Sequence, residues 1–194
     1  MSDNIDEKIL DIINAKERVE RYKNLEEIEI KIGKEYYIFK EFKFYDNKLI
    51  MYLPSDFSDM KLELRKIKYP YEDRPEIIRC NNDGSICFTL KIIDSPLNED
   101  KVETLTNGMK EMMQRLNPAN VFFDMKIEKA NEKNIGYFDF KTTVIDGFLY
   151  NIMFFFEFKG KTAFGGFSCK YSDCNDWRDI VIEVIKKIRV IEEE

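Results

Sequence analysis

The stretch IGYFDFKTTVIDGFLYNIMFFFEFKGKTAFGGFSCKY, residues 135–171, decides the fold of this chain. Two turn dipeptides, Asp146-Gly147 and Lys159-Gly160, divide it into three strand-length pieces that are rich in aromatic residues. Consecutive strands joined by two-residue turns pair as hairpins. The stretch therefore predicts an antiparallel meander.

Counting outward from each turn gives the expected register of the meander. The first turn places Phe138 opposite Phe155. The second places Phe155 beside Phe164 and Phe154 beside Gly165, where the missing side chain leaves room for an aromatic ring. The middle strand, residues 148–158, is apolar on both faces, which is typical of a strand at the centre of a sheet covered on both sides.

Two amphipathic helices are expected to supply these covers. The first spans residues 98–116, and Pro118 prevents its continuation. Its apolar face comprises Val102, Leu105, Met109, Met112, Met113 and Leu116. The second follows the meander, with Asn175 or Asp176 as its cap and Trp177 as a buried anchor.

A hairpin and an earlier strand are predicted nearer the amino terminus. Residues 27–32 alternate isoleucine with charged or polar residues, which is the period of a half-buried strand. A hairpin turning at residues 46–47 brings Phe44 opposite Leu49, so one of its faces is apolar.

The segments between these elements are less regular. Residues 60–68 fit either a strand or irregular structure. Residues 69–75 contain two prolines, which remove hydrogen-bond donors and favour extended conformations before them, so this loop cannot be regular. Residues 121–128 alternate apolar with charged side chains and predict a strand with one buried face, formed by Val121, Phe123, Met125 and Ile127.

The first residues predict a helix with a narrow apolar stripe. Residues 3–22 place Ile5, Ile9 and Ile12 along one side. This helix is either docked on the outside of the fold or an arm that captures a partner. We therefore expect a helical extension over residues 1–24 and a single domain over residues 25–194, since 194 residues suit one large core.

Composition and charge exclude several classes of partner. The 31 Lys and Arg residues are scattered among 37 Asp and Glu residues, for a net charge of -6, and do not form a basic stripe. Nucleic acid is therefore not an expected partner. No apolar run is long enough for a membrane span or follows the acidic first residues as a signal would. We expect a cytoplasmic protein that is a monomer or a weak homodimer.

The chain has no histidine, which excludes nucleophile pairs and metal sites that need imidazole within this chain. A hairpin turning at residues 83–84 would bring Cys80 opposite Cys87, where a disulfide is sterically possible. We expect free thiols there in a reducing compartment. A zinc site of all four cysteines is the alternative, although their spacings match no zinc ribbon. Neither a metal nor a cofactor is predicted.

The order of these elements resembles the PsbP-like superfamily, which includes the extrinsic photosystem II protein, a Ran-binding nuclear-import factor and bacterial DcrB-like proteins. The resemblance covers about residues 42–191. The residues that carry it are Leu53-Pro54, Phe57, the helix face from Leu105 to Leu116, the strand from Tyr150 to Phe156, Gly165-Gly166-Phe167 and Trp177. The resemblance implies an α+β fold: an α/β/α sandwich around a central, mainly antiparallel sheet of six or seven strands.

The resemblance also implies a function. Its relatives serve as non-catalytic adaptors that bind another protein, so this chain is predicted to be a protein-binding or adaptor module and not an enzyme. A bacterial secretion or toxin-immunity system is one setting for such a module. The alternative is an enzyme with a carboxylate or cysteine centre, which a cavity gathering buried polar residues would favour.

The predicted partner-binding residues are Tyr69, Tyr71 and Arg74, in the loop of residues 69–75. Tyrosine and arginine are enriched among interface hot spots, and the prolines lower the entropy cost of ordering the loop. The alternative is that the tyrosines pack over a sheet edge while Arg74 caps backbone carbonyls.

Overall fold

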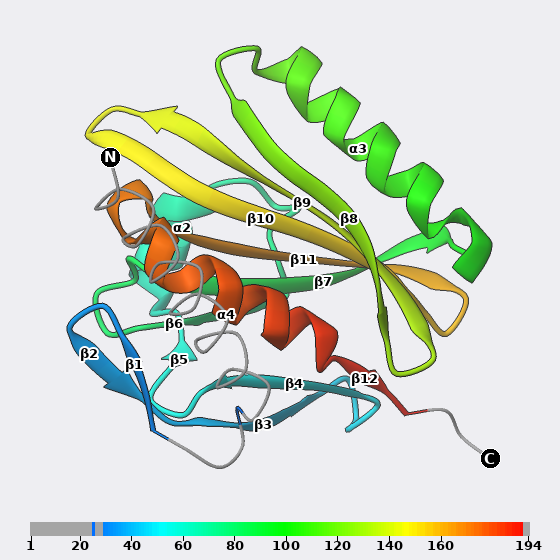
Figure 1. Ribbon diagram of the computed structural model, residues 1–194, viewed down its shortest axis with the longest axis horizontal. Helices are drawn as coiled ribbons and strands as arrows, with labels where there is room; N and C mark the ends of the chain where they lie inside the picture. The colour runs from blue at the N-terminus through cyan, green and yellow to red at the C-terminus, as the bar shows by residue number, and fades with distance from the viewer. Residues whose placement is uncertain (1–24, 26–28, 192–194) are drawn as a thin grey trace, which may run out of the picture.

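The computed structural model describes residue 25 and residues 29–191, and its centre is a seven-stranded antiparallel sheet (Figure 1). We call this the main sheet. Its strands, in spatial order, are β5 (Ser58–Asp59), β6 (Ile77–Cys80), β7 (Cys87–Pro96), β11 (Lys161–Lys170), β10 (Gly147–Phe158), β9 (Lys133–Val144) and β8 (Val121–Ala130). The predicted meander is therefore confirmed, and β10 lies inside the sheet between β9 and β11.

The two turns of the meander differ in how well the sequence predicted them. The second is confirmed, because Phe155 pairs with Phe164 and Phe154 with Gly165. The first register is wrong by two residues, because Phe138 pairs with Met153. Gly147 (φ +137°) pairs with Val144 as the first residue of β10, so the turn consists of residues 145–146.

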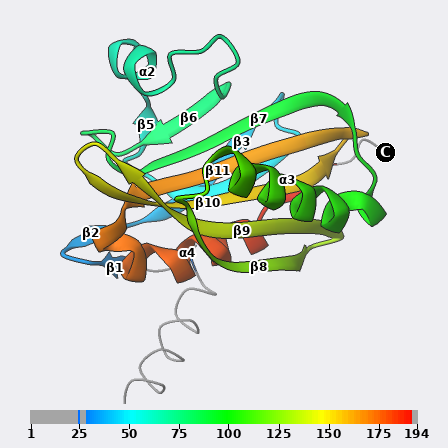
Figure 2. The same ribbon diagram turned by 90° about the horizontal axis from the view of Figure 1, so that it is seen from above.

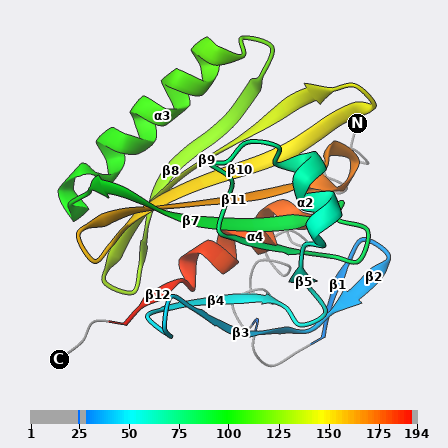
Figure 3. The ribbon, with the colours of Figure 1, turned by 180° about the vertical axis from the view of Figure 1, so that it is seen from behind.

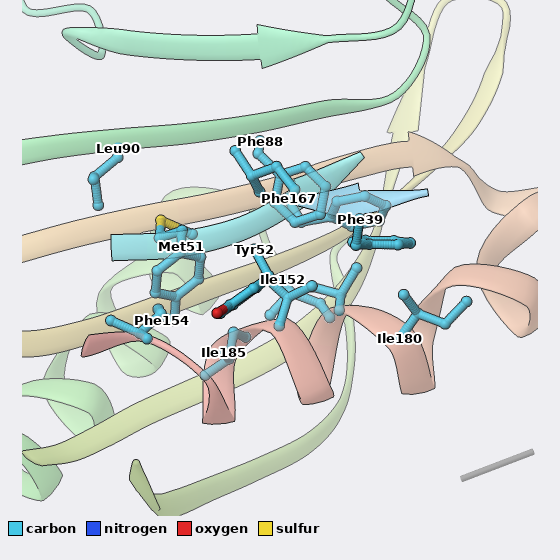
Figure 4. Close-up of a cluster of buried hydrophobic side chains, with 14 of the residues drawn as sticks. Phe39, Met51, Tyr52, Phe88, Leu90, Ile152, Phe154, Phe167, Ile180 and Ile185 are labelled. Carbon is cyan, nitrogen blue, oxygen red and sulfur yellow. The ribbon is translucent and has the colours of Figure 1, made fainter. Parts of the chain in front are cut away.

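One face of the main sheet, which we call the α4 face, is covered by a helix and by a second, smaller sheet. Helix α4 (Cys174–Lys186) packs on it, together with a small sheet of β3 (Phe39–Phe44), β4 (Leu49–Pro54) and β12 (Arg189–Val190). Figure 4 shows side chains from both sheets and α4 meeting in one cluster, including Phe39, Phe88, Ile152 and Ile180. The register predicted for the β3–β4 hairpin is confirmed, with Phe44 opposite Leu49.

Trp177 and Gly165 are the two positions that fix the packing on this face. Trp177 is 2% exposed, and its ring lies 5.1 Å from that of Tyr37 and 5.6 Å from that of Phe167, so it is the predicted core anchor. A Cβ added to Gly165 would come within 2.0 Å of Phe154 Cζ. The predicted role of Gly165, to make room for a ring, is confirmed.

The opposite face, which we call the α3 face, carries α3 (Val102–Leu116) over β9 and β10 (Figures 1 and 2). Leu105, Met109 and Met113 pack there against the buried rings of Phe138, Phe140 and Phe155. Thr106 is fully buried and lies so close to Gly136 that a Cβ on Gly136 would come within 1.9 Å of its Oγ1. The predicted apolar face of the helix is too wide, because Met112 and Leu116 are 43% and 72% exposed.

A short helix, α2 (Leu62–Lys68), covers another part of the α3 face. The sequence predicted a strand or irregular structure over residues 60–68, which is wrong. Leu64 and Tyr69 pack on a small buried cluster of Met60, Ile78, Cys80 and Cys87. Figure 2 shows α2 and α4 on opposite sides of the main sheet. The loop of residues 69–75 that follows α2 has no helix or strand, as predicted.

The edge strand β8 departs from the predicted alternation. Its register with β9 shifts between Phe122 and Met125, which marks a β-bulge. As a result Phe122 and Met125 both face α3, while Val121 and Phe123 are 46% and 43% exposed. The strand itself is confirmed, and its predicted buried face is correct for Met125 and Ile127 but wrong for Val121 and Phe123.

The ends of the described chain complete the fold. The predicted strand over residues 27–32 is found as β1 (Ile30–Ile32), which pairs with β2 (Glu35–Tyr37). The predicted helix over residues 3–22 lies outside the described residues.

Helix α4 begins earlier than predicted, directly after the 3-10 turn η2 (Tyr171–Asp173), so neither Asn175 nor Asp176 caps it. A second 3-10 turn, η1 (Glu99–Lys101), precedes α3.

Candidate functional site

An open groove of about 470 Å³ lies on the α3 face, on the part that α2 and α3 leave uncovered. Figure 3 shows these two helices well apart from each other in the view from behind. Half-buried side chains of β7, β10 and β11 form the floor of the groove: Thr89, Leu149, Asn151, Met153, Phe164 and Ser168, together with Gly166. Lys68, Tyr69 and Pro75 form its wall, and Phe140 closes the floor toward α3.

The alternation of burial along the strands shows why the floor is open. On β11, Phe164, Gly166 and Ser168 are half-buried, while the residues between them, on the α4 face, are buried. The side chains of β10 show the same difference, because Asn151 and Met153 are half-buried but Phe155, under α3, is buried. The uncovered part of the sheet therefore leaves side chains of its central strands accessible for contact.

The wall of the groove is held in place by side chains on either side of it. Arg65 of α2 donates hydrogen bonds from Nη2 to the backbone oxygens of Pro75, at 2.5 Å, and Glu76, at 2.8 Å. Lys91 of β7 binds the carboxylate of Asp73. The loop of residues 69–75 is therefore tied to both α2 and the main sheet, which lowers the entropy cost of binding through it.

The three predicted site residues take different positions in this wall. Tyr69 lines the groove and packs on the buried cluster beneath α2, and burial raises the pKa of its hydroxyl to about 12. Tyr71 is 80% exposed, and Arg74 is half-buried on the same loop. Arg65, and not Arg74, binds the backbone oxygens at the end of the loop. The loop thus places Tyr69 in the groove, with Tyr71 and Arg74 beside it.

The groove carries positive charge in an acidic chain. Lys68 is exposed at its wall, where its ammonium group donates to the backbone oxygen of Gly84 and lies 3.8 Å from Cys87 Sγ. Lys170 is exposed two residues beyond Ser168, on the same face of β11. Within the described part of the chain, no aspartate or glutamate lines the groove.

The most buried carboxylate of the main sheet lies on the α4 face, away from the groove. Asp139 is 1% exposed and accepts hydrogen bonds from Tyr150 Oη (2.8 Å), Arg178 Nε (2.7 Å) and the backbone nitrogen of Asp124 (2.7 Å). Burial, together with the Asp139 carboxylate, raises the pKa of Tyr150 well above its usual range. With three donors bound, Asp139 serves to join α4 to β8, β9 and β10.

Three of the four cysteines are buried, Cys174 is half-buried, and all four are thiols with low reactivity. Cys80 and Cys87 are partners across β6 and β7, as predicted, and all four cysteines are free. Burial raises the pKa of Cys87 to about 11 in spite of the neighbouring Lys68, and it also raises the pKa of Cys80, Cys169 and Cys174. A thiol that stays protonated at neutral pH is a poor nucleophile and a poor metal ligand.

The described residues hold neither a metal-binding cluster nor a membrane-spanning helix. Among residue 25 and residues 29–191, no three His, Cys, Asp or Glu side chains lie close enough together to hold a metal ion. The helices in the same part of the chain are all too short or too polar to cross a bilayer.

The sequence identified the wall of the groove but missed its floor. Asn151, Gly166 and Ser168 are polar or small residues on central strands that otherwise carry large apolar side chains. Their common face could have been found from the predicted register of β10 and β11. Its exposure could not, because it depends on where α2 and α3 end on the sheet.

Comparison with known proteins supports the fold and gives no match in sequence. No protein-family profile matches the chain, and no curated protein matches it either.

Three solved structures have a similar fold. CyanoP, the PsbP protein of Synechocystis sp. PCC 6803, aligns with a TM-score of 0.58 and 7% identity over 79% of this chain and 92% of its own. A point mutant of Mog1 aligns with a TM-score of 0.52 and 10% identity over 79% of this chain and 96% of its own. LpqN of Mycobacterium tuberculosis, described as involved in cell envelope biogenesis, aligns with a TM-score of 0.52 and 7% identity over 79% and 91%. The chain therefore has the predicted PsbP-like α+β fold.

Proposed function

We propose that this chain of PsbP-like fold is a non-catalytic module that binds another protein, with the groove on the α3 face and the adjoining loop of residues 69–75 as its binding surface. The observation that carries the proposal is the half-buried floor of the groove, between α3 and the loop. Apolar and aromatic side chains that remain half-accessible next to a preformed wall are what a protein interface needs.

The chemistry of the described side chains supports binding over catalysis. The buried carboxylate of Asp139 has its hydrogen bonds satisfied on the other face of the sheet, and burial keeps the thiols protonated. The groove is lined instead by side chains suited to contact: Met153, Phe164 and Tyr69. An enzyme would need an activated nucleophile or a base there.

Proteins of the same fold lend further support. The PsbP-like superfamily that the chain resembles in sequence order includes a Ran-binding nuclear-import factor. By analogy with fold alone, this chain is proposed to use its sheet and loops as a scaffold for a protein partner. The narrower prediction, a role in a bacterial secretion or toxin-immunity system inside the cytoplasm, stays a prediction, as does the monomer or weak homodimer.

Copurification tests the proposal. The tagged full chain is recovered from its native cell, and bound proteins are identified by mass spectrometry. We expect the double variant Tyr71→Ala, Arg74→Ala to lose its partner about tenfold or more, because hot-spot residues contribute ~1–2 kcal/mol or more each. The control is Tyr36→Ala, Arg115→Ala, which removes the same two residue types at exposed positions on β2 and α3.

Two results would contradict the proposal. One is that no protein is recovered specifically with the wild-type chain. The other is that the loop variant and the control retain the partner equally while both remain folded by circular dichroism.

A further inference from the structure

The floor of the groove limits what can lie on it. Strand β11 is paired along one edge with β10 and along the other with β7, so its backbone hydrogen-bonding groups are used within the sheet. An extended segment laid over this floor would bury its own N–H and C=O groups without partners. A helix satisfies these groups internally.

The layer already present on this face is also helical. Helix α3 packs on β9 and β10 through Leu105, Met109 and Met113. A second helix on β10, β11 and β7 would extend the same layer across the uncovered strands. From Phe164 to Ser168 the floor is about 13 Å long at ~3.3 Å per strand residue. That length matches roughly nine residues of helix.

The side chains of the floor suit an amphipathic helix. Leu149, Met153 and Phe164 offer apolar contacts, and methionine adapts its shape to different partners. Gly166 has no side chain, so a helix can come close to the sheet there. The apolar stripe of an incoming helix would lie on these residues.

The charges around the groove favour a partner helix that carries negative charge. Lys68 stands at the wall and Lys170 at the end of the floor, and among the described residues no carboxylate lines the groove. The chain as a whole has a net charge of -6, so the lining of the groove differs in sign from the average, whereas the adjoining loop carries the exposed carboxylates of Glu72 and Asp73. Complementary charge steers and orients binding.

We infer that the groove binds an amphipathic α-helix of a partner protein, about nine residues or more in contact, whose apolar stripe lies on β10 and β11 and whose flanks are acidic. This inference rests on the proposed function and names the partner's chemistry. A basic helix, an extended peptide and a second copy of this chain are the competing occupants.

A displayed library of helix-forming 14-residue peptides tests the inference directly. In the library, every position varies among Ala, Leu, Glu, Gln and Lys in equal shares, so that neither the spacing of the apolar residues nor the net charge is fixed in advance. It is selected on the full-length chain and, in parallel, on Ser168→Trp, whose indole would fill the floor of the groove. We expect peptides enriched on the wild type to keep helical spacing of apolar residues, to carry more Glu than Lys, and to lose binding to Ser168→Trp about tenfold or more.

A charge reversal at the wall provides a second readout that leaves the side chains of the floor in place. Because Lys68 also donates to the backbone oxygen of Gly84, the free energy of unfolding of each variant is measured alongside its binding. Fluorescence anisotropy with an enriched acidic peptide compares Lys68→Glu with Lys126→Glu, which makes the same change at an exposed position on β8. We expect Lys68→Glu to weaken binding about tenfold and Lys126→Glu to leave it within about twofold.

Several outcomes would overturn the inference. They are enriched peptides without helical spacing, enrichment of Lys over Glu, equal binding to Ser168→Trp, or equal effects of the two charge reversals. A concentration-dependent dimer that Ser168→Trp abolishes would assign the groove to a second copy. If the substitution Ile9→Lys in the full chain makes peptide binding tenfold tighter, the natural occupant of the groove is this chain's own segment of residues 3–22. The sequence of that segment also predicts an acidic amphipathic helix.

The experiments can contradict either proposal without contradicting the other. If a native partner is recovered and depends on Tyr71 and Arg74, but its binding is unchanged by Ser168→Trp and Lys68→Glu, then the protein-binding function stands and the helix inference falls. If no native partner is recovered, the proposed function falls, whatever the peptides show.

Discussion

The two faces of the main sheet are built from the same three central strands but are completed differently. On the α4 face, Ile152, Phe154 and Phe167 are at most 2% exposed under α4 and the small sheet. On the α3 face, the alternate residues Met153 and Phe164 are half-buried beside the groove.

This difference separates the source of stability from the binding surface. Burial of apolar area dominates the folding free energy, so the α4 face should account for most of it. The exposed floor of the α3 face contributes less to stability and is available for contact with a partner.

The largest expected effect is the loss of the tryptophan on the closed face. Trp177→Ala should lower the free energy of unfolding by ~3–5 kcal/mol, because it leaves a cavity among Tyr37, Phe57 and Phe167. Met153→Ala, which removes a half-buried side chain from the groove floor, should cost only about 1–2 kcal/mol. Urea denaturation of both variants measures the contrast, and equal losses would remove the distinction between the faces.

Two neighbouring glycines on β11 give a closer comparison. A Cβ on Gly165 would come within 2.0 Å of Phe154 Cζ in the core, whereas a Cβ on Gly166 would come within 2.8 Å of the Thr89 hydroxyl, which can rotate away toward the groove. Gly165→Ala should therefore lower the free energy of unfolding by ~1–3 kcal/mol. Gly166→Ala should stay within about 1 kcal/mol of the wild type, since alanine suits a strand better than glycine.

The glycine comparison is checked by thermal and urea unfolding of the two variants. A loss at Gly166→Ala as large as that at Gly165→Ala would show that the α3 face is as tightly packed as the α4 face at β11.

A pH dependence should reveal how firmly the wall of the groove is packed. Burial raises the pKa of Tyr69 from 10.0 to about 12, so the folded state keeps the phenol proton while the unfolded chain loses it. Tyr69 therefore stabilises the fold fully below pH 10, and this contribution is lost as the pH rises toward about 12. Tyr69→Phe should make the fall in unfolding free energy over this range shallower. An unchanged slope would mean that the Tyr69 hydroxyl is solvated.

The smallest effect on stability is expected at the exposed end of the wall. Tyr71 is 80% exposed, so Tyr71→Ala should change the free energy of unfolding by no more than about 0.5 kcal/mol. Partner recovery should nevertheless fall, because an exposed tyrosine on an ordered loop is available for contact. A clear loss of stability would instead assign Tyr71 to the packing of the loop.

The sequence predicted those parts of the fold that depend on local pattern. The β3–β4 and β10–β11 hairpins were correct in register, and in the latter Lys159 and Gly160 both have positive φ, as a tight turn requires. The β9–β10 register was wrong because Gly147 begins a strand instead of ending the turn. The same kind of dipeptide fits both arrangements, and only the pairing with the next strand decides between them.

Features set by tertiary packing could not be predicted from local pattern. The bulge in β8 reverses the faces of Phe122 and Phe123, and nothing in their alternation marks it. Helix α2 is only seven residues long and buries none of them, so although its residues favour a helix, the segment is too short to show a clear amphipathic period. The loop of residues 69–75 was predicted from its prolines, but the groove beside it depends on how far α3 extends over the sheet.

Site-specific photo-crosslinking tests the central claim most directly. Benzoylphenylalanine replaces Tyr71, the exposed aromatic residue beside the groove, or Lys126, exposed on the far edge strand β8, and the full chain is irradiated in its native cell. The account predicts a covalent adduct from position 71 only, with the same protein that copurifies with the wild-type chain. An adduct from position 126 alone, or copurification of a partner without any adduct at position 71, would contradict it.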